Sequence, residues 1–148
     1  VKTADLLVIG RITNYEVIRD EAFRKKMLET PNLPADMRKQ YEGPDSLISD
    51  YARFTVQVAQ VLAGNAGATF TATWDNSTFG EPVEMAQGPF LIALRAETPN
   101  AAIAISGSPQ REPNVMTILQ APCARAFIFE ISSDEARITR DILTLNPK

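Results

Sequence analysis

The sequence predicts a mostly β protein built as one small barrel, with a helical segment after the first strand and a helix near the C-terminal end. Residues 51–74 carry the two observations that predict the barrel. Apolar and polar side chains alternate on both sides of a Gly/Asn turn at residues 64–67, which is typical of a hairpin with one buried face. The alternation changes phase at Ala59 and Gln60, as the extra residue of a β-bulge would cause. A strongly bent hairpin of this kind favours a small closed barrel over a flat sheet.

Length and charge limit the class of protein. A chain of 148 residues is expected to form a single domain, residues 1–148. Fifteen basic against eighteen acidic residues give a net charge of -3, which argues against nucleic acid or an anionic membrane surface as a partner. The apolar runs are far shorter than the roughly 20 residues of a membrane-spanning helix, so no membrane span is expected.

The chain contains no histidine and one cysteine, Cys123. The lack of histidine excludes Ser-His-Asp and Cys-His catalysis and removes the usual transition-metal ligands. We therefore expect no catalytic residue, no metal site and no cofactor. Cys123 cannot form an intramolecular disulfide and is expected to be a small buried residue; an intermolecular bridge or a reactive thiol are the alternatives.

The first strand is predicted over residues 6–18. Val8, Gly10 and Ile12 share one face, and the alternation slips near Thr13 and Asn14. A glycine followed by such a slip indicates a long strand that bends sharply enough to serve both sides of a barrel; an irregular strand end is the alternative.

Residues 20–50 change character and predict a helical insertion. Asp20 is a suitable N-cap, and Pro31 ends the first helix. Apolar residues recur at four-residue spacing in two runs, Phe23 with Met27, then Leu33 with Met37 and Tyr41. We expect this narrow apolar stripe to pack on the barrel. The basic run Arg24, Lys25 and Lys26 is interpreted as a solvated face, with a basic docking patch as the alternative.

Further strands are predicted over residues 90–95, 101–106, 115–119 and 126–131, and a helix over residues 133–145. Both faces of the 90–95 segment are apolar, so we expect both to be covered. Ser132 with Glu135 forms a predicted capping box for the helix. Its apolar stripe of Ile138, Ile142 and Leu145 is expected to lie against the barrel.

Three segments in this order resemble a known family. They are Ala4-Asp5-x-x-Val8-x-Gly10-x-Ile12, then Tyr51-x-x-Phe54-x-Val56-x-Val58-x-x-Val61-x-x-Gly64, then Phe90-Leu91-Ile92-Ala93-Leu94-Arg95. Over about residues 4–97 the chain resembles bacterial secreted proteins with the OB-type barrel of the netrin and tissue-inhibitor-of-metalloproteinase modules.

The resemblance implies an OB-like fold and export to the periplasm or the exterior. Export fits a chain that starts at Val1 after removal of a signal peptide; a trimmed start is the alternative. The family's inhibitors grip a protease's metal through a disulfide-tethered N-terminal cysteine. This chain begins Val1-Lys2-Thr3, so the inhibitory mechanism does not carry over.

We expect a non-enzymatic binding or protein-interaction module whose contact surface lies on the loops 74–88 and 106–114. The partner would be another protein or a cell-envelope component, and the chain itself a monomer or weak dimer. The candidate contact residues are Arg53, Trp74, Asp75, Asn76, Phe79 and Glu81.

Two other functions remain open. An oligonucleotide- or oligosaccharide-binding barrel would use Tyr51, Phe70, Trp74 and Phe79 as a stacking platform. Against it, Phe70 and Trp74 share the inward parity of Ala72, and Arg53 and Arg95 are the few basic residues nearby. A carboxylate-dependent hydrolase would need Asp45 or Asp50 in a shared cleft. The pair Asp134 and Glu135 is assigned to helix capping instead.

Overall fold

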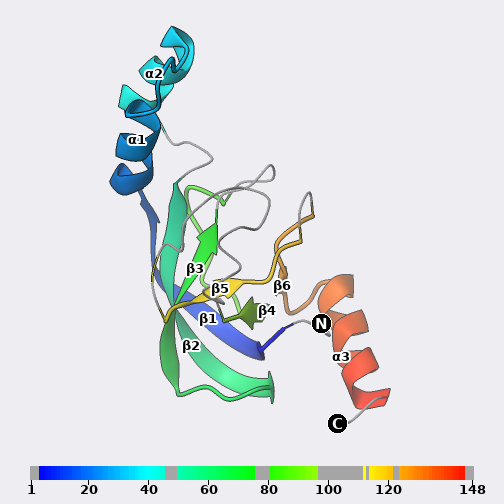
Figure 1. The fold of residues 1–148 in the computed structure, drawn as a ribbon. Coiled ribbons are helices and arrows are strands. Elements are labelled where there is room, and N and C mark those ends of the chain that lie inside the picture. Colours follow the sequence, from blue (N-terminus) through cyan, green and yellow to red (C-terminus); the bar gives the residue numbers. More distant parts are fainter. Residues whose placement is uncertain are drawn as a thin grey trace.

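The computed structural model describes residues 4–45, 50–75, 81–96, 112, 114–121 and 124–145, and these residues are mostly β (Figure 1). Cys123 and the strand predicted over residues 101–106 lie outside them. The strands are β1 (Leu6–Ile18), β2 (Tyr51–Ala63), β3 (Thr69–Asp75), β4 (Phe90–Arg95), β5 (Met116–Ile118) and β6 (Ile128–Glu130). The helices are α1 (Glu21–Leu28), α2 (Ala35–Glu42) and α3 (Asp134–Leu145).

Five strands close into a small barrel. The sheet order β1-β2-β3-β5-β4 returns to β1 because β1 also pairs with β4. The β3–β5 pair is parallel and the other pairs are antiparallel, so the barrel is mixed. This arrangement is consistent with an OB-like fold. The sixth strand, β6, pairs with β4 beyond β5. The fold class expected from the sequence is confirmed.

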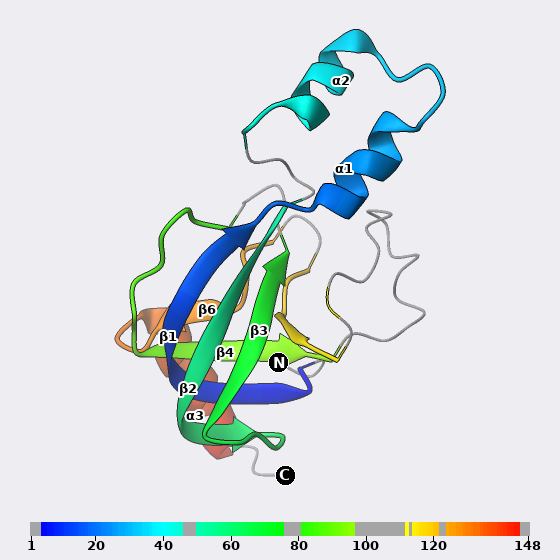
Figure 2. The same cartoon turned by 90° about the vertical axis from the view of Figure 1, so that its left-hand side faces the viewer.

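The bend of β1 lets one strand serve two neighbours (Figure 2). Its first half pairs with β4, and it pairs with β2 along nearly its whole length. The predicted bulge of β2 is present, because Ile9 pairs with Gln60 and Gly10 pairs with Val58, leaving Ala59 as the extra residue. The predicted slip of β1 is also present: the register shifts between Thr13 and Glu16, and Asn14 has a φ of 51°.

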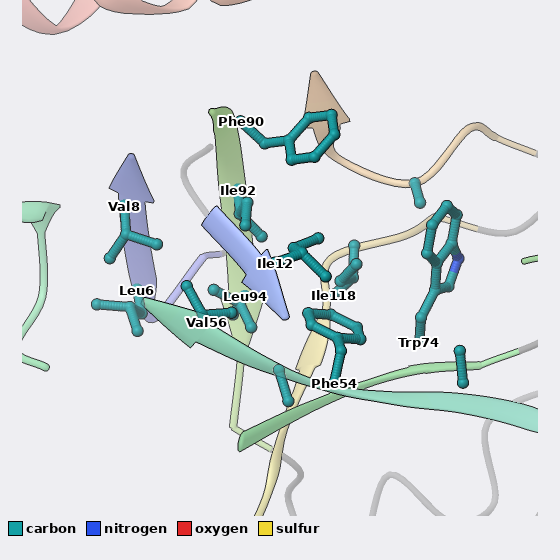
Figure 3. Packing of buried hydrophobic residues seen from close by; sticks show 13 residues of the cluster. Leu6, Val8, Ile12, Phe54, Val56, Trp74, Phe90, Ile92, Leu94 and Ile118 are labelled. Carbon is teal, nitrogen blue, oxygen red and sulfur yellow. The ribbon is translucent and has the colours of Figure 1, made fainter. Parts of the chain in front are cut away.

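The barrel interior is filled by the inward side chains of every barrel strand (Figure 3). Phe54 and Trp74 belong to this cluster, and Phe70 packs against it. A second cluster covers the outer face of β4 through Leu91 and Ala93, under α3. Strand β4 is therefore covered on both faces, as its apolar sequence predicts.

The helical insertion is confirmed, but its expected packing on the barrel is wrong. Asp20 caps α1 by accepting a hydrogen bond from the Phe23 amide at 2.9 Å. Helices α1 and α2 pack on each other, with the rings of Phe23 and Tyr41 6.3 Å apart, and both stand beyond the end of the barrel in both views (Figures 1 and 2). The apolar side chains of each helix therefore pack against the other helix. Each helix is too short to bury them by itself.

Within the basic run of α1, Lys25 and Lys26 are exposed as expected, but Arg24 is 1% exposed. The interpretation of Arg24 as solvated is therefore wrong. Its guanidinium forms a buried ion pair with Asp50, at 2.7 Å between Nη2 and Oδ2. The insertion is thus tied to the start of β2 by charge.

Helix α3 lies on the barrel through a different face from the one expected. Ala136 is fully buried and Thr139 is 7% exposed, whereas Ile138 and Ile142 are about half exposed. The N-cap is Ser133, not Ser132, since Ser133 Oγ accepts a hydrogen bond from the Ala136 amide. The barrel surface under α3 already carries the bulky rings of Phe127 and Phe129, so the small side of the helix fits against it.

Candidate functional site

The predicted contact residues that the structure describes do not all share one face of the sheet. Arg53 and Asp75 lie next to the inward residues Phe54 and Trp74 along β2 and β3, so their side chains face outward. Trp74 has the opposite parity and points into the barrel, where it is 9% exposed. Asn76, Phe79 and most of the predicted loop 106–114 lie outside the described residues.

The outward residues of β2 are held by a distant residue, Glu112. Its carboxylate accepts a hydrogen bond from the Tyr51 hydroxyl at 3.0 Å and pairs with Arg53 Nε at 3.1 Å. Nothing in the local sequence pattern marks Glu112, because its partners lie in another strand. These contacts therefore hold Glu112 at the start of β2.

Glu81 lies near Tyr15, on the side of the barrel where β1 slips. The Tyr15 hydroxyl donates a hydrogen bond to the Pro82 carbonyl at 2.6 Å, and its ring stacks on Phe54. Burial raises the pKa of the Tyr15 hydroxyl well above its usual range, and the Glu81 carboxylate raises it further. Tyr15 therefore acts as a neutral donor that holds this loop.

A cavity of about 490 Å³ lies beside Trp74. Its apolar lining consists of Trp74, Ala126, Ile128 and Phe129. Its polar lining consists of Arg125, Glu130, Ser133 and Glu135. The cavity thus joins the end of β3 to β6 and to the first turn of α3, and we call it the Trp74 cavity. Neither the β6 residues nor the start of α3 was predicted as part of a site.

The indole N–H of Trp74 is buried and has no hydrogen-bond acceptor among the described residues. In Figure 3 the nitrogen lies on the side of the ring turned away from Ile12, Phe54 and Ile118. A buried donor without an acceptor costs about 1–3 kcal/mol. An oxygen atom of a ligand or of water that reached this nitrogen would remove the cost.

The charged groups of the cavity are available to a ligand. Arg125, Glu130 and Glu135 are all exposed, and none takes part in an ion pair among those found in the described part of the chain. One guanidinium and two carboxylates give the lining a small negative excess. The Arg125 guanidinium of the lining can therefore donate hydrogen bonds to a ligand, and the two carboxylates can bind a cationic group. The apolar side chains of the lining can contact the rest of the ligand.

A second exposed feature is the outer stripe of α3. Ile138, Ile142 and Leu145 are 50%, 51% and 78% exposed, at spacings that place them on one side of the helix. Arg137 bridges Asp134 and Asp141 beside this stripe. Exposed aliphatic residues in one stripe are typical of contact surfaces, but nothing in the structure indicates what covers this one.

Within the described ranges, no group of three or more acidic, cysteine or histidine side chains is placed to hold a metal ion. None of the helices in that part of the chain is long and apolar enough to cross a membrane. The fold defines a small OB-like barrel with a helical insertion and a C-terminal helix. The chain matches no protein-family model. Comparisons with curated proteins and with solved structures likewise gave no significant match.

Proposed function

We propose that this chain is a non-enzymatic binding module and that it binds its ligand in the Trp74 cavity. The observation that carries the proposal is the buried Trp74 N–H, which has no acceptor among the described residues and belongs to a ring that lines a cavity with exposed charged groups. Buried donors are nearly always satisfied in proteins, so one left open beside a cavity supports a ligand oxygen at that position.

The side chains that could serve as catalytic groups are few, which supports a binding role over an enzymatic one. The chain has no histidine, and the carboxylate of Asp50 is committed to the buried ion pair with Arg24. Asp45, the other carboxylate of a hypothetical hydrolase, contacts Arg24 through its backbone carbonyl. A hydrolase that used the Asp50 carboxylate would first have to break the ion pair that links the insertion to the barrel.

The setting that we propose is the periplasm or the cell exterior, with another protein or a cell-envelope component as the partner. This part of the proposal depends on the resemblance to the netrin and tissue-inhibitor-of-metalloproteinase modules and on the barrel they share in outline. This is an argument from the fold, whereas the argument for binding is the Trp74 cavity.

The second candidate, an oligonucleotide- or oligosaccharide-binding barrel, finds less support. Where β2 pairs with β3, the outward side chains are Arg53, Thr55, Gln57, Thr69, Thr71, Thr73 and Asp75, next to the buried Tyr51. Of the predicted stacking platform, Trp74 and Phe70 belong to the barrel interior instead. Single-stranded nucleic acids rely on exposed aromatic rings and a basic groove, and this face has one arginine.

The single tryptophan makes the proposal directly testable, since the protein has only one indole N–H signal in its NMR spectrum. We would titrate the labelled protein with three probes: a short peptide, a trisaccharide and a thymidine oligonucleotide. We expect at least one probe to shift the indole signal. Trp74→Phe, which keeps an aromatic ring but removes the donor, should weaken binding about three- to tenfold.

The matched control is Gln57→Ala, on the outer face of β2, which should leave binding unchanged. If none of the probes moves the indole signal at millimolar concentration, the Trp74 cavity is not a binding site for these classes and the proposal fails. If Gln57→Ala abolishes binding instead, the site lies on the outer face of β2 and β3.

A further inference from the structure

Among the described strands, β3 and β6 lie along one line of the barrel without pairing with each other. Strand β4 pairs with β1 on one edge, and its other edge is shared by β5 and β6 in succession. Strand β3 pairs with β5 only through Ala72 with Met116 and Thr73 with Thr117, and it ends at Asp75. Beyond that point β6 is paired with β4 on one side, and no described strand pairs with its other side. We call this line the β3–β6 seam; the Trp74 cavity lies along it.

The backbone of β6 shows which groups face the seam. The Ala93 amide donates a hydrogen bond to the Phe127 carbonyl, and the Ile131 amide donates one to the Pro89 carbonyl. Bonded pairs alternate with non-bonded pairs in an antiparallel ladder, so the backbone groups of Ile128 and Glu130 point away from β4.

Two of these four outward groups are already used. The Ile128 amide donates to the Ala126 carbonyl at 2.9 Å, and the Glu130 carbonyl accepts from the Ser133 amide at 2.9 Å. The Ile128 carbonyl and the Glu130 amide remain, and neither takes part in a hydrogen bond found among the described residues.

This pattern of used and unused groups selects a strand direction. In a parallel pair, each bonded residue of the added strand lies opposite a partner residue of the existing strand. Its amide donates to the carbonyl of the residue that precedes the partner, and its carbonyl accepts from the amide of the residue that follows the partner. The unused groups of Ile128 and Glu130 flank Phe129 in this way. An antiparallel neighbour would need the Ile128 amide or the Glu130 carbonyl, which are occupied. The favoured direction is also that of β3 beside β5.

We propose that an extended peptide segment adds to β6 as a parallel strand across the Trp74 cavity, and that Glu130 and Glu135 bind a lysine or arginine side chain of that segment. Strand addition of this kind takes its affinity from main-chain hydrogen bonds and its selectivity from side-chain pockets. An oxygen of the peptide would accept the Trp74 indole N–H. The inference rests on the proposed function and names the class of its ligand.

The test uses the labelled protein and an acetylated, amidated hexapeptide of alternating valine and threonine with one central lysine. In the free protein, the Glu130 amide should exchange rapidly with solvent, and the Phe129 amide, which faces β4, should exchange slowly. With saturating peptide, we expect the Glu130 amide to become protected by about tenfold or more and the Trp74 indole signal to shift.

A pair of variants at one position separates the backbone contact from the charge. Glu130→Pro removes the carboxylate together with the outward amide N–H, a loss that edge strands tolerate, and should weaken peptide binding by about tenfold. Glu130→Ala keeps the amide and should weaken binding by only about threefold, with a smaller dependence on salt. Circular dichroism of both variants checks that the barrel is folded.

Each outcome decides between the two proposals. If the peptide shifts the indole signal but leaves Glu130 exchange unchanged, strand addition is wrong and the Trp74 cavity remains a binding site. If only the trisaccharide or the oligonucleotide shifts the signal, a peptide is the wrong ligand class. If no probe shifts it, both proposals fail. A Glu130 amide that is already protected in the free protein would show that the edge is covered and would overturn the inference.

Discussion

Arg24 and Asp50 form a buried ion pair across 26 residues of sequence, and this pair fastens the helical insertion to the barrel. Asp50 Oδ1 also accepts the Asp20 amide, at the start of α1. The other terminal guanidinium nitrogen of Arg24, Nη1, donates to backbone carbonyls near the end of α2, including that of Gly43 at 3.3 Å. One side chain therefore links both helices of the insertion to the first residue before β2.

Asp50→Ala should destabilise the protein strongly, because it leaves the Arg24 guanidinium buried without its counter-ion. We expect the free energy of unfolding in urea to fall by about 3–5 kcal/mol. Arg137→Ala is the control, since its ion pairs with Asp134 and Asp141 are exposed, and it should cost less than about 1 kcal/mol. Equal effects of the two substitutions would contradict the fastening role of the buried pair.

Gly10→Ala tests the bend of β1. A Cβ at this position would lie 2.8 Å from the Gln57 carbonyl oxygen and 2.9 Å from Val56 Cγ1. Both contacts are too close, so the substitution should lower the free energy of unfolding by about 1–3 kcal/mol. The comparison is Gly67→Ala, where the nearest atom is 3.7 Å away and the expected change is within about 0.5 kcal/mol. A Gly10→Ala variant as stable as Gly67→Ala would show that the bend does not depend on this close approach.

Substitutions on the two faces of α3 should have unequal effects on stability. Ile138→Lys alters an exposed position and should change the free energy of unfolding by no more than about 0.5 kcal/mol. Ala136→Leu adds bulk at a fully buried position against the barrel and should cost about 1–3 kcal/mol. Urea unfolding measures both. The reverse order would mean that α3 lies on the barrel through its Ile138 face, as the apolar pattern alone predicts.

The raised pKa of Tyr15 predicts a loss of stability in alkaline solution. The folded protein holds the Tyr15 proton more tightly than the unfolded chain, whose hydroxyl titrates near the usual 10.0. Above that pH the folded state binds more protons, so the free energy of unfolding falls as the pH rises. Tyr15→Phe should cost about 1 kcal/mol at neutral pH through the lost bond to Pro82.

The same substitution supplies the alkaline test. Urea unfolding of both proteins from neutral pH upward should show the difference in their free energies of unfolding shrinking above pH 10.0. A difference that stays constant over this range would contradict the role of Tyr15 burial.

The strand pattern was predictable because it depends on local alternation. The bulge at Ala59, the slip near Asn14 and the cap at Asp20 each follow from the residue types and spacing at the site itself. The candidate site was only partly predictable. Trp74 was selected, but Glu130 and Glu135 of the same cavity were not, because they reach it only through the pairing of β6 with β4 and the start of α3.

The sequence by itself determined a mostly β barrel with an insertion and a closing helix, since alternation, turn residues and caps act between near neighbours in the chain. The tertiary structure decided which faces of the helices are buried and which are exposed. Arg24 differs from Lys25 only because Asp50 lies beside it after folding, and Ala136 faces the barrel because aromatic rings already fill the surface there. Charge pairing and packing volume act between residues far apart in sequence, so only the folded chain can settle them.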